Sequence, residues 1–182
     1  MKKSFRYAKL GLKNKIARTI WVFFWLFLFR PTPNLFHPWR AFLLIIFGAQ
    51  LGRRVHVYPS AKVWAPWNLE MGDDSCISEY VDCYCVDKIQ IGSSSTVSQY
   101  SFLCTASHDY SKASMPLVIA PISIGDKAWI TSDVFIGPGV RIGNGAVVIA
   151  RSSVFKNIPD WAIARGNPAI VEGKRRIDDA PN

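Results

Sequence analysis

Apolar residues recur at every sixth position along most of this chain, from residue 51 to residue 154. The residue four positions later is usually small or β-branched, as at Val55 and Ala61, and Gly often follows the apolar residue directly, as at Gly52. The apolar series comprises Leu51, Val57, Val63, Met71, Ile77, Cys83, Ile91, Val97, Leu103, Ile124, Ile130, Ile136, Ile142, Val148 and Val154. All fifteen are apolar when Cys83 is counted, so the pattern indicates an internal repeat of six residues.

This repeat predicts a solenoid of short parallel strands, in which each hexapeptide supplies one strand and one corner. The apolar residue points into a narrow interior, and the corner accepts a residue that is small or tolerates positive φ. Slips of two residues at 69–70, 89–90 and 122–123 fall after every third hexapeptide, which favours three-sided coils stacked about 4.8 Å apart. A β-sandwich also repeats at multiples of two residues, but fifteen consecutive matches favour the solenoid.

The segment before the repeat differs from it in pattern. Two apolar runs, "IWVFFWLFLF" at 20–29 and "AFLLIIF" at 41–47, are separated by "RPTPN", which breaks any helix. As a helix the first run is about 15 Å long, roughly half of a bilayer's hydrocarbon core, so we expect neither run to span a membrane. The sequence predicts an apolar, basic helical segment over 1–48, a β-helix domain over 49–158 and a C-terminal tail over 159–182.

The formal net charge of +9 is concentrated at the start of the chain. Residues 1–69 hold 12 of the 22 Lys and Arg and no Asp or Glu, whereas the rest holds 10 bases and all 13 acids. Bases beside an apolar run, without a groove-reading motif, argue against nucleic acid binding. Residues 1–48 therefore contact an anionic membrane surface, cap the open end of the solenoid as repeat proteins require, or are buried between subunits.

Two further features bear on the compartment. No small-residue cleavage site follows the first apolar run, so the N-terminus does not read as a signal peptide. The four cysteines lack the spacing of zinc ligands and are expected to stay reduced as small apolar residues. We expect a cytoplasmic protein, in contact with the inner membrane face if residues 1–48 bind lipid.

The repeat stops at "TASHDYSKASMPLVIAPISIG", residues 105–125, and the interruption predicts a loop over 104–121. This loop carries His108 followed by Asp109. An imidazole takes up a proton at neutral pH, and a loop thrown out from a rigid coil can hold it over a cleft. His108 is therefore either a solvated loop residue with no role or a group that takes part in acid–base chemistry. Two other histidines, His37 and His56, are interpreted as structural.

With these repeats in view, the motifs "SHDY", "PISIGDKAWI", "IGPGVRIGNGAVVIARSSVFKNIP" and "GNPA" resemble those of the hexapeptide-repeat O-acetyltransferases, in particular the colanic-acid-type, galactoside and maltose enzymes. The resemblance implies a mainly β fold, a left-handed parallel β-helix, assembled as a homotrimer. It implies an active-site loop over 104–121 and transfer of an acetyl group from acetyl-CoA to a sugar hydroxyl, with His108 as the general base and no metal. It also implies direct transfer, so Cys104 is not expected to act as a nucleophile. Asp109 either polarises the His108 imidazole or points elsewhere.

The same resemblance implies a donor site. Trp129 matches a tryptophan that lines the cleft, and Ser132 follows it at the matching distance. Ala150 matches a small residue beside the pantetheine arm, and Lys156 matches a lysine near the phosphates of coenzyme A. For the 3′-phosphate the candidates are Arg165 and the basic run Lys174, Arg175 and Arg176.

The sequence specifies the acceptor less closely than it specifies the donor. Galactoside-type relatives carry an Asn and an Asp upstream of the loop, where "SEYVDCYCVDK" offers only Asp82 and Asp87. The branch implies a sugar hydroxyl in a repeating unit of exopolysaccharide, capsule or O-antigen, assembled on a lipid carrier. A free sugar or a nucleotide-sugar is the alternative acceptor.

Two other function classes share this coil architecture. A γ-type carbonic anhydrase needs three histidines that converge on zinc, and the three present here include His37, which precedes the repeat. A non-catalytic β-helix scaffold is disfavoured by the intact "SHDY" and "GNPA".

Overall fold

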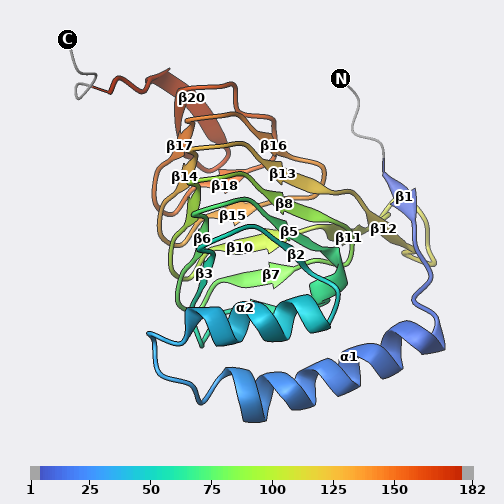
Figure 1. Ribbon diagram of the computed structural model, residues 1–182. Helices are drawn as coiled ribbons and strands as arrows, with labels where there is room; N and C mark the ends of the chain where they lie inside the picture. Colours follow the sequence, from blue (N-terminus) through green and yellow to red (C-terminus); the bar gives the residue numbers. More distant parts are fainter. Residues whose placement is uncertain (1–4, 178–182) are drawn as a thin grey trace.

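The chain folds into a three-sided parallel β-solenoid with two helices at its N-terminal end, as seen in a computed structural model that describes residues 5–177 (Figure 1). Face 1 contains β2 (Gln50–Leu51), β5 (Leu69–Met71), β8 (Ile89–Ile91), β13 (Ile122–Ile124) and β16 (Arg141–Ile142). Face 2 contains β3 (His56–Val57), β6 (Cys76–Ile77), β9 (Thr96–Val97), β14 (Trp129–Ile130), β17 (Val147–Val148), β19 (Ala162–Gly166) and the antiparallel β20 (Ala169–Lys174). Face 3 contains β4 (Lys62–Val63), β7 (Asp82–Tyr84), β10 (Phe102–Cys104), β15 (Phe135–Ile136) and β18 (Ser153–Val154).

The strand register confirms the six-residue repeat. The fifteen apolar positions form three columns of stacked residues, one behind each face. On face 2, for example, Val57 pairs with Ile77, and Val97 pairs with Ile130. Every member is buried except Leu51, which is partly exposed at the end of the stack. The aliphatic interior therefore follows directly from the period of the sequence.

The corners show why glycine follows the apolar residue. Gly92 does not have positive φ; an added Cβ there would lie 2.5 Å from the backbone carbon of Gly125 on the next coil. The residues with a left-handed backbone (positive φ) lie two positions after these glycines and are not glycines themselves, for example Arg54, Asp74 and Ser94. Of the two roles predicted for corner residues, glycine here mainly permits close approach between coils.

The two N-terminal helices cover the first coil. Helix α1 (Leu12–Phe24) continues into a π-helical turn, η1 (Trp25–Phe29), and α2 (His37–Ile46) lies across the open end (Figure 1). Trp21 and Leu44 are buried there, and the Trp21 indole donates to the carbonyl of Val63 at 2.6 Å. The 3₁₀ turn η2 (Pro66–Asn68) accounts for the first slip in the repeat. Among residues 5–177, no helix is both long and apolar enough to cross a bilayer.

These boundaries lie close to the expected segments. The coil strands run from Gln50 to Val154, and β19 and β20 extend face 2 beyond residue 158. The division of the chain at residues 48 and 158 stays a prediction.

A small antiparallel sheet stands outside the solenoid. It consists of β1 (Arg6–Tyr7), β12 (Leu117–Ile119) and β11 (Ala106–His108), in that order. Strands β11 and β12 form the hairpin that interrupts the repeat, and β1 adds the start of the chain to its edge.

Candidate active site

The hairpin leaves the solenoid at the corner between faces 3 and 1, after β10 and before β13. Thr105 anchors it: the buried hydroxyl donates to the carbonyl of Tyr84 at 2.8 Å and accepts the backbone N–H of Asp87 at 3.0 Å. On the returning strand, the N–H of Ala120 donates to the Thr105 carbonyl at 2.9 Å. Thr105 thus ties the β11–β12 hairpin to the coil beneath it, and the bond from Ala120 closes the base of the hairpin.

His108 ends β11 with its imidazole exposed, and Nδ1 lies 2.6 Å from the backbone carbonyl of Met115. A carbonyl oxygen can only accept, so Nδ1 carries the proton in this contact. In the neutral ring Nε2 then has a lone pair. The geometry therefore gives His108 the tautomer that a general base requires.

Asp109 is engaged away from the imidazole. Its carboxylate accepts the phenolic hydroxyl of Tyr7 at 2.7 Å and the hydroxyl of Ser111 at 2.5 Å. These hydrogen bonds, that of Ser111 first, lower the pKa of Asp109. Nδ1 of His108 is bound by Met115 instead, so Asp109 supports the loop in this structure, and a direct part in catalysis stays a prediction.

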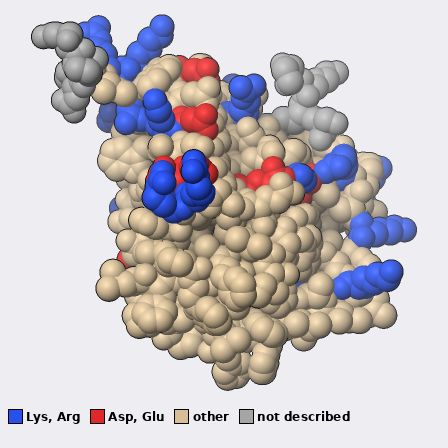
Figure 2. All heavy atoms as spheres, in the orientation of Figure 1, with Lys and Arg blue, Asp and Glu red and all other residues tan. Residues whose placement is uncertain are grey.

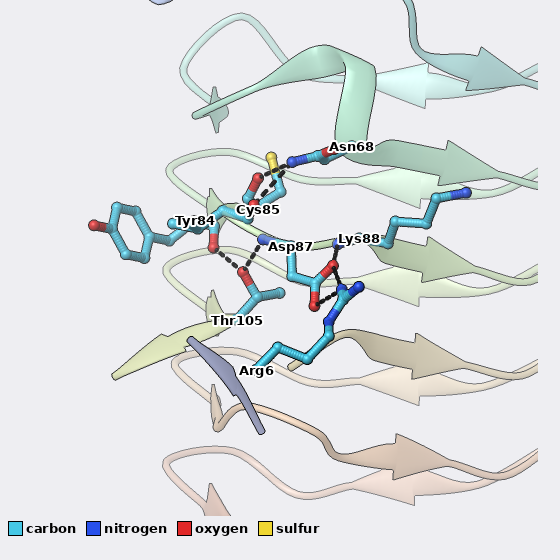
Figure 3. A network of polar contacts seen from close by, with 8 residues as sticks. Arg6, Asn68, Tyr84, Cys85, Asp87, Lys88 and Thr105 are labelled. Atoms are coloured by element: carbon cyan, nitrogen blue, oxygen red, sulfur yellow. Dashed lines mark hydrogen bonds and ion pairs between the residues drawn. The ribbon is translucent and has the colours of Figure 1, made fainter. Parts of the chain in front are cut away.

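The sequence pattern does not predict strand β1. Tyr7 pairs with Val118 of β12, and the N–H of Ala8 donates to the Leu117 carbonyl at 3.0 Å. Arg6 reaches the solenoid and binds the carboxylate of Asp87, which in turn accepts the N–H of Lys88 (Figure 3). Only two residues form this strand, and no periodic pattern surrounds them.

A cavity of about 460 Å³ lies at the junction of β1 and the hairpin. His108 and Asp109 line it together with aromatic rings from both segments. The complete lining is Phe5, Tyr7, Ser107, His108, Asp109, Tyr110, Ser111 and Val118. His108 borders this space as a residue, but the strand register turns its side chain to the face opposite Tyr7 and Val118.

The candidate donor residues lie mostly on the other side of the coil. Trp129 is on face 2, half exposed, and its indole donates to the hydroxyl of Ser98 at 3.0 Å. Arg165, on β19 of the same face, forms an ion pair with Glu172 at 2.8 Å. Ser132 and Ala150 follow β14 and β17, at the corner between faces 2 and 3.

Lys156 stands apart from the other four. It follows β18, so it lies at the corner between faces 3 and 1 where the hairpin also leaves. In each coil the chain passes through faces 1, 2 and 3 in turn, so this corner is opposite face 2. One chain therefore does not bring His108 and Lys156 together with Trp129 and Arg165.

The two acceptor candidates differ in environment. The Asp87 carboxylate is almost fully buried and already holds Arg6, so a sugar would have to displace a formed ion pair. Asp82 is half-buried on face 3 in a separate cavity of about 350 Å³, beside Trp64 and Tyr84. Burial raises the pKa of Asp82, although nearby Lys62 opposes this. Neither carboxylate lines the cavity next to His108.

The cysteines and the other histidines have different environments. Burial raises the pKa of the Cys104 thiol, which donates to the carbonyl of Ala106 at 3.1 Å, so this thiol has no thiolate character at neutral pH. His37 stacks on His56 beside the first coil, with ring centroids 4.5 Å apart. Within residues 5–177, no three His, Cys, Asp or Glu side chains gather as a metal site would require.

Comparison with known proteins identifies the family, although no family model matches the chain. WcaF of Escherichia coli K12, assigned to colanic acid biosynthesis as an acetyltransferase, is 44% identical over 162 residues, which cover 89% of each chain. A maltose O-acetyltransferase from Clostridium difficile 630 superposes with a TM-score of 0.85 at 27% identity, covering 96% of this chain and 94% of that one.

A third relative shows the fold alone. A hexapeptide-repeat acetyltransferase from Vibrio cholerae O1 biovar eltor, solved with acetyl coenzyme A, has a TM-score of 0.82 at 23% identity and covers 94% of both chains. The identity and coverage of WcaF, together with the shared solenoid, confirm the resemblance found in the motifs. The chain belongs to the hexapeptide-repeat acetyltransferases.

Proposed function

We propose that this acetyltransferase moves an acetyl group from acetyl-CoA to a sugar hydroxyl, with His108 as the general base. The observation that carries the proposal is the contact between Nδ1 of His108 and the Met115 carbonyl, because it leaves Nε2 of an exposed imidazole as an acceptor. Nε2 takes the hydroxyl proton while the sugar oxygen bonds to the thioester carbonyl carbon. The C–S bond then breaks, and the leaving thiolate of coenzyme A takes the proton from the imidazolium.

The donor is bound between two copies of the chain. His108 and Lys156 stand at one corner of the solenoid and Trp129 and Arg165 on the opposite face, so a complete site needs a second copy. In a closed ring of three copies this contact forms three times, and no copy is left with an unpaired contact surface. The Vibrio cholerae relative, solved with acetyl coenzyme A, supports the choice of donor through the shared fold.

The acceptor is a sugar of a polysaccharide repeating unit. WcaF, similar over 89% of its length, is assigned to colanic acid biosynthesis, which favours an exopolysaccharide, capsule or O-antigen unit over a free sugar or nucleotide-sugar. Asp82 is the freer of the two acidic candidates, since Asp87 is held by Arg6.

The N-terminal helices bind the surface of the membrane that carries this acceptor. They cap the first coil, yet many apolar side chains remain 39% to 86% exposed. These are Leu12, Ile16, Ile20, Val22, Phe23, Leu26, Phe27, Leu28, Leu35, Phe36, Trp39, Phe42, Ile45 and Ile46. In Figure 2 the part of the surface around these helices carries almost no charge, and basic side chains project at its edge. This arrangement favours anionic lipid and the cytoplasmic membrane face.

The membrane contact is tested by flotation with anionic phosphatidylglycerol vesicles. We expect the full-length protein to float at low salt and a variant carrying Phe23→Ser and Phe27→Ser to stay at the bottom. A matched control carries Phe155→Ser and Ile170→Ser, which are similarly exposed at the other end of the solenoid, and should still float. If the wild-type protein stays at the bottom at low salt, the helices cap the solenoid but do not bind the membrane.

The catalytic proposal is tested by acetyl-CoA consumption and by the acetyl content of the cell's polysaccharide. We expect His108→Ala to keep acetyl-CoA binding and to lower acetyl transfer by about two orders of magnitude or more. Deletion of the gene should remove acetyl groups that mass spectrometry detects in the polysaccharide. Near-wild-type turnover by His108→Ala contradicts the assignment of the base, and an unchanged acetyl content contradicts the polysaccharide acceptor.

A further inference from the structure

We infer that a cavity between helix α1 and face 3 is a second saccharide subsite, which binds a sugar next to the one that is acetylated. The side chains that would bind it are Arg18 on α1 and Lys62, Trp64, Asp82 and Tyr84 on face 3. This inference rests on the proposed saccharide acceptor. It adds a place where the acceptor is recognised outside the hairpin that carries the candidate base.

The side chains from face 3 all point out of the coil on the same side of one sheet. The central residues of β4 and β7 are buried in the interior, so the residues on either side of them point outward. These are Lys62 and Trp64 in the first coil, and Asp82 and Tyr84 in the second. Lys62 pairs with Asp82 in the register, and the rings of Trp64 and Tyr84 have centroids 5.5 Å apart.

Helix α1 and its continuation η1 turn one side toward the same cavity. Arg18, Trp21, Val22 and Trp25 line it, and the last three lie three, four and seven residues after Arg18, as neighbours on one side of a helix do. The indoles of Trp21 and Trp25 donate to backbone carbonyls of the first coil at 2.6 and 2.9 Å. The cavity of about 350 Å³ therefore lies between two elements that are fixed to each other.

Three charged groups line this cavity without pairing with one another. Among residues 5–177, none of Arg18, Lys62 and Asp82 forms an ion pair. The guanidinium of Arg18 lies 4.1 Å from the centre of a Trp64 ring, and its Nε donates to the side chain of Asn14 at 3.0 Å. Asp82 is half-buried. A polar ligand that enters the cavity can therefore gain hydrogen bonds from two cations and a carboxylate.

This set of groups fits a saccharide better than a phosphate or an acyl chain. A carboxylate accepts hydrogen bonds from sugar hydroxyls, Arg and Lys donate to them, and aromatic rings pack against the C–H groups of a pyranose. A phosphate suits the two cations but is repelled by Asp82. An acyl chain suits the indoles but would desolvate all three charges.

The cavity also lies where a neighbouring sugar of the acceptor is expected. Strands β4 and β7 precede β10 on face 3, and the hairpin leaves from the end of β10. The Tyr84 carbonyl accepts the Thr105 hydroxyl that anchors the hairpin, while the Tyr84 ring points away from that corner (Figure 3). On its other side the cavity includes Val22, which is 49% exposed on the helical surface proposed to meet the membrane. An acceptor on a lipid carrier would extend past this cavity to the hairpin.

The test measures acetyl transfer by full-length variants to a repeating-unit oligosaccharide, released from the polysaccharide of the cells that carry this gene and O-deacetylated. We expect Asp82→Asn and Arg18→Met to raise the KM for this oligosaccharide about fivefold to twentyfold, with kcat and the affinity for acetyl-CoA changed by about twofold at most. Lys13→Met, which removes an exposed base of α1 outside the cavity, is the matched control and should match wild type.

The outcomes separate this inference from the proposed function. Wild-type KM values in both variants overturn the second subsite, even while the wild-type enzyme acetylates the oligosaccharide. Loss of flotation with phosphatidylglycerol vesicles at an unchanged KM assigns the cavity to a lipid head group and overturns the subsite too. Equal losses of affinity for acetyl-CoA and for the oligosaccharide also contradict it, because the cavity would then support the fold. A wild-type enzyme that acetylates no saccharide removes the proposed acceptor and this inference together.

Discussion

Nη2 of Arg6 donates hydrogen bonds to both carboxylate oxygens of Asp87, at 2.7 and 2.6 Å, and so joins two residues 81 positions apart. The Asp87 side chain is 7% exposed, whereas that of Arg6 is 62% exposed. The carboxylate is therefore the member of the pair that depends on its partner, since water can solvate the guanidinium but not the buried oxygens.

This asymmetry predicts unequal effects of the two substitutions. Arg6→Gln leaves a buried carboxylate with the Lys88 N–H as its remaining partner, and should lower the free energy of unfolding by about 1–3 kcal/mol. Asp87→Asn leaves an arginine in water and should cost less. Chemical denaturation measures both, with Arg53→Gln, which breaks an exposed ion pair to Asp73, as the control. Equal losses for all three variants would show that burial does not decide the effect.

A second prediction concerns the corners of the coil. Gly92→Ala adds a methyl group 2.5 Å from the backbone of the next coil, so one coil must move, at about 1–3 kcal/mol of stability. Gly173→Ala meets no atom within 4 Å and should leave stability unchanged. Thermal unfolding of the two variants compares them directly. If the thermal unfolding midpoint of Gly92→Ala equals that of the wild type, the corner accommodates the methyl group and the predicted clash is wrong.

The difference between what the sequence predicts and what it misses follows from how many residues determine each feature. The solenoid is specified by fifteen apolar positions that must all face one narrow interior, so the columns that contain Val57 and Ile77 could be predicted residue by residue. Strand β1 depends on Arg6 and Tyr7 alone, and their partners Asp87 and Val118 are far along the chain. No local pattern encodes such a contact.

The candidate site is predicted unevenly for a similar reason. His108 stands out because it lies in the interruption of the repeat, and its tautomer depends on the carbonyl of Met115, which any residue supplies. The alternative roles of Asp109 could not be decided from sequence, because adjacent side chains on a hairpin diverge. Here that carboxylate binds Tyr7, from the strand that the sequence did not reveal.

The cap of the solenoid should weaken at acid pH. Burial lowers the pKa of His37 below the ordinary 6.5, and the nearby charge of Arg40 acts in the same direction, against the Val57 carbonyl and Glu79. A depressed histidine pKa means that the unfolded chain binds the proton first. The contribution of neutral His37 to the stability of the folded protein is therefore complete above pH 6.5. It is lost as the pH falls through the lower pKa of the folded state.

Thermal unfolding between pH 8 and pH 5 tests this sign. We expect the wild-type midpoint to fall as the pH drops below about 6.5, and the fall to be smaller for His37→Gln. A His37→Gln variant that shows the same slope would assign the acid sensitivity to other groups.

The last prediction concerns the site shared between copies. His108→Ala and Trp129→Ala should each be inactive as pure assemblies, because every site then lacks one component. When both variants are co-expressed, each interface pairs chains at random, and about one quarter combine an intact His108 with an intact Trp129 from the neighbour. Activity should recover to about that fraction of wild type. The same two variants, purified separately and mixed without subunit exchange, are the control and should stay inactive. Absence of recovery in verified mixed assemblies would mean that His108 and Trp129 serve the same chain, against their positions on opposite sides of the coil.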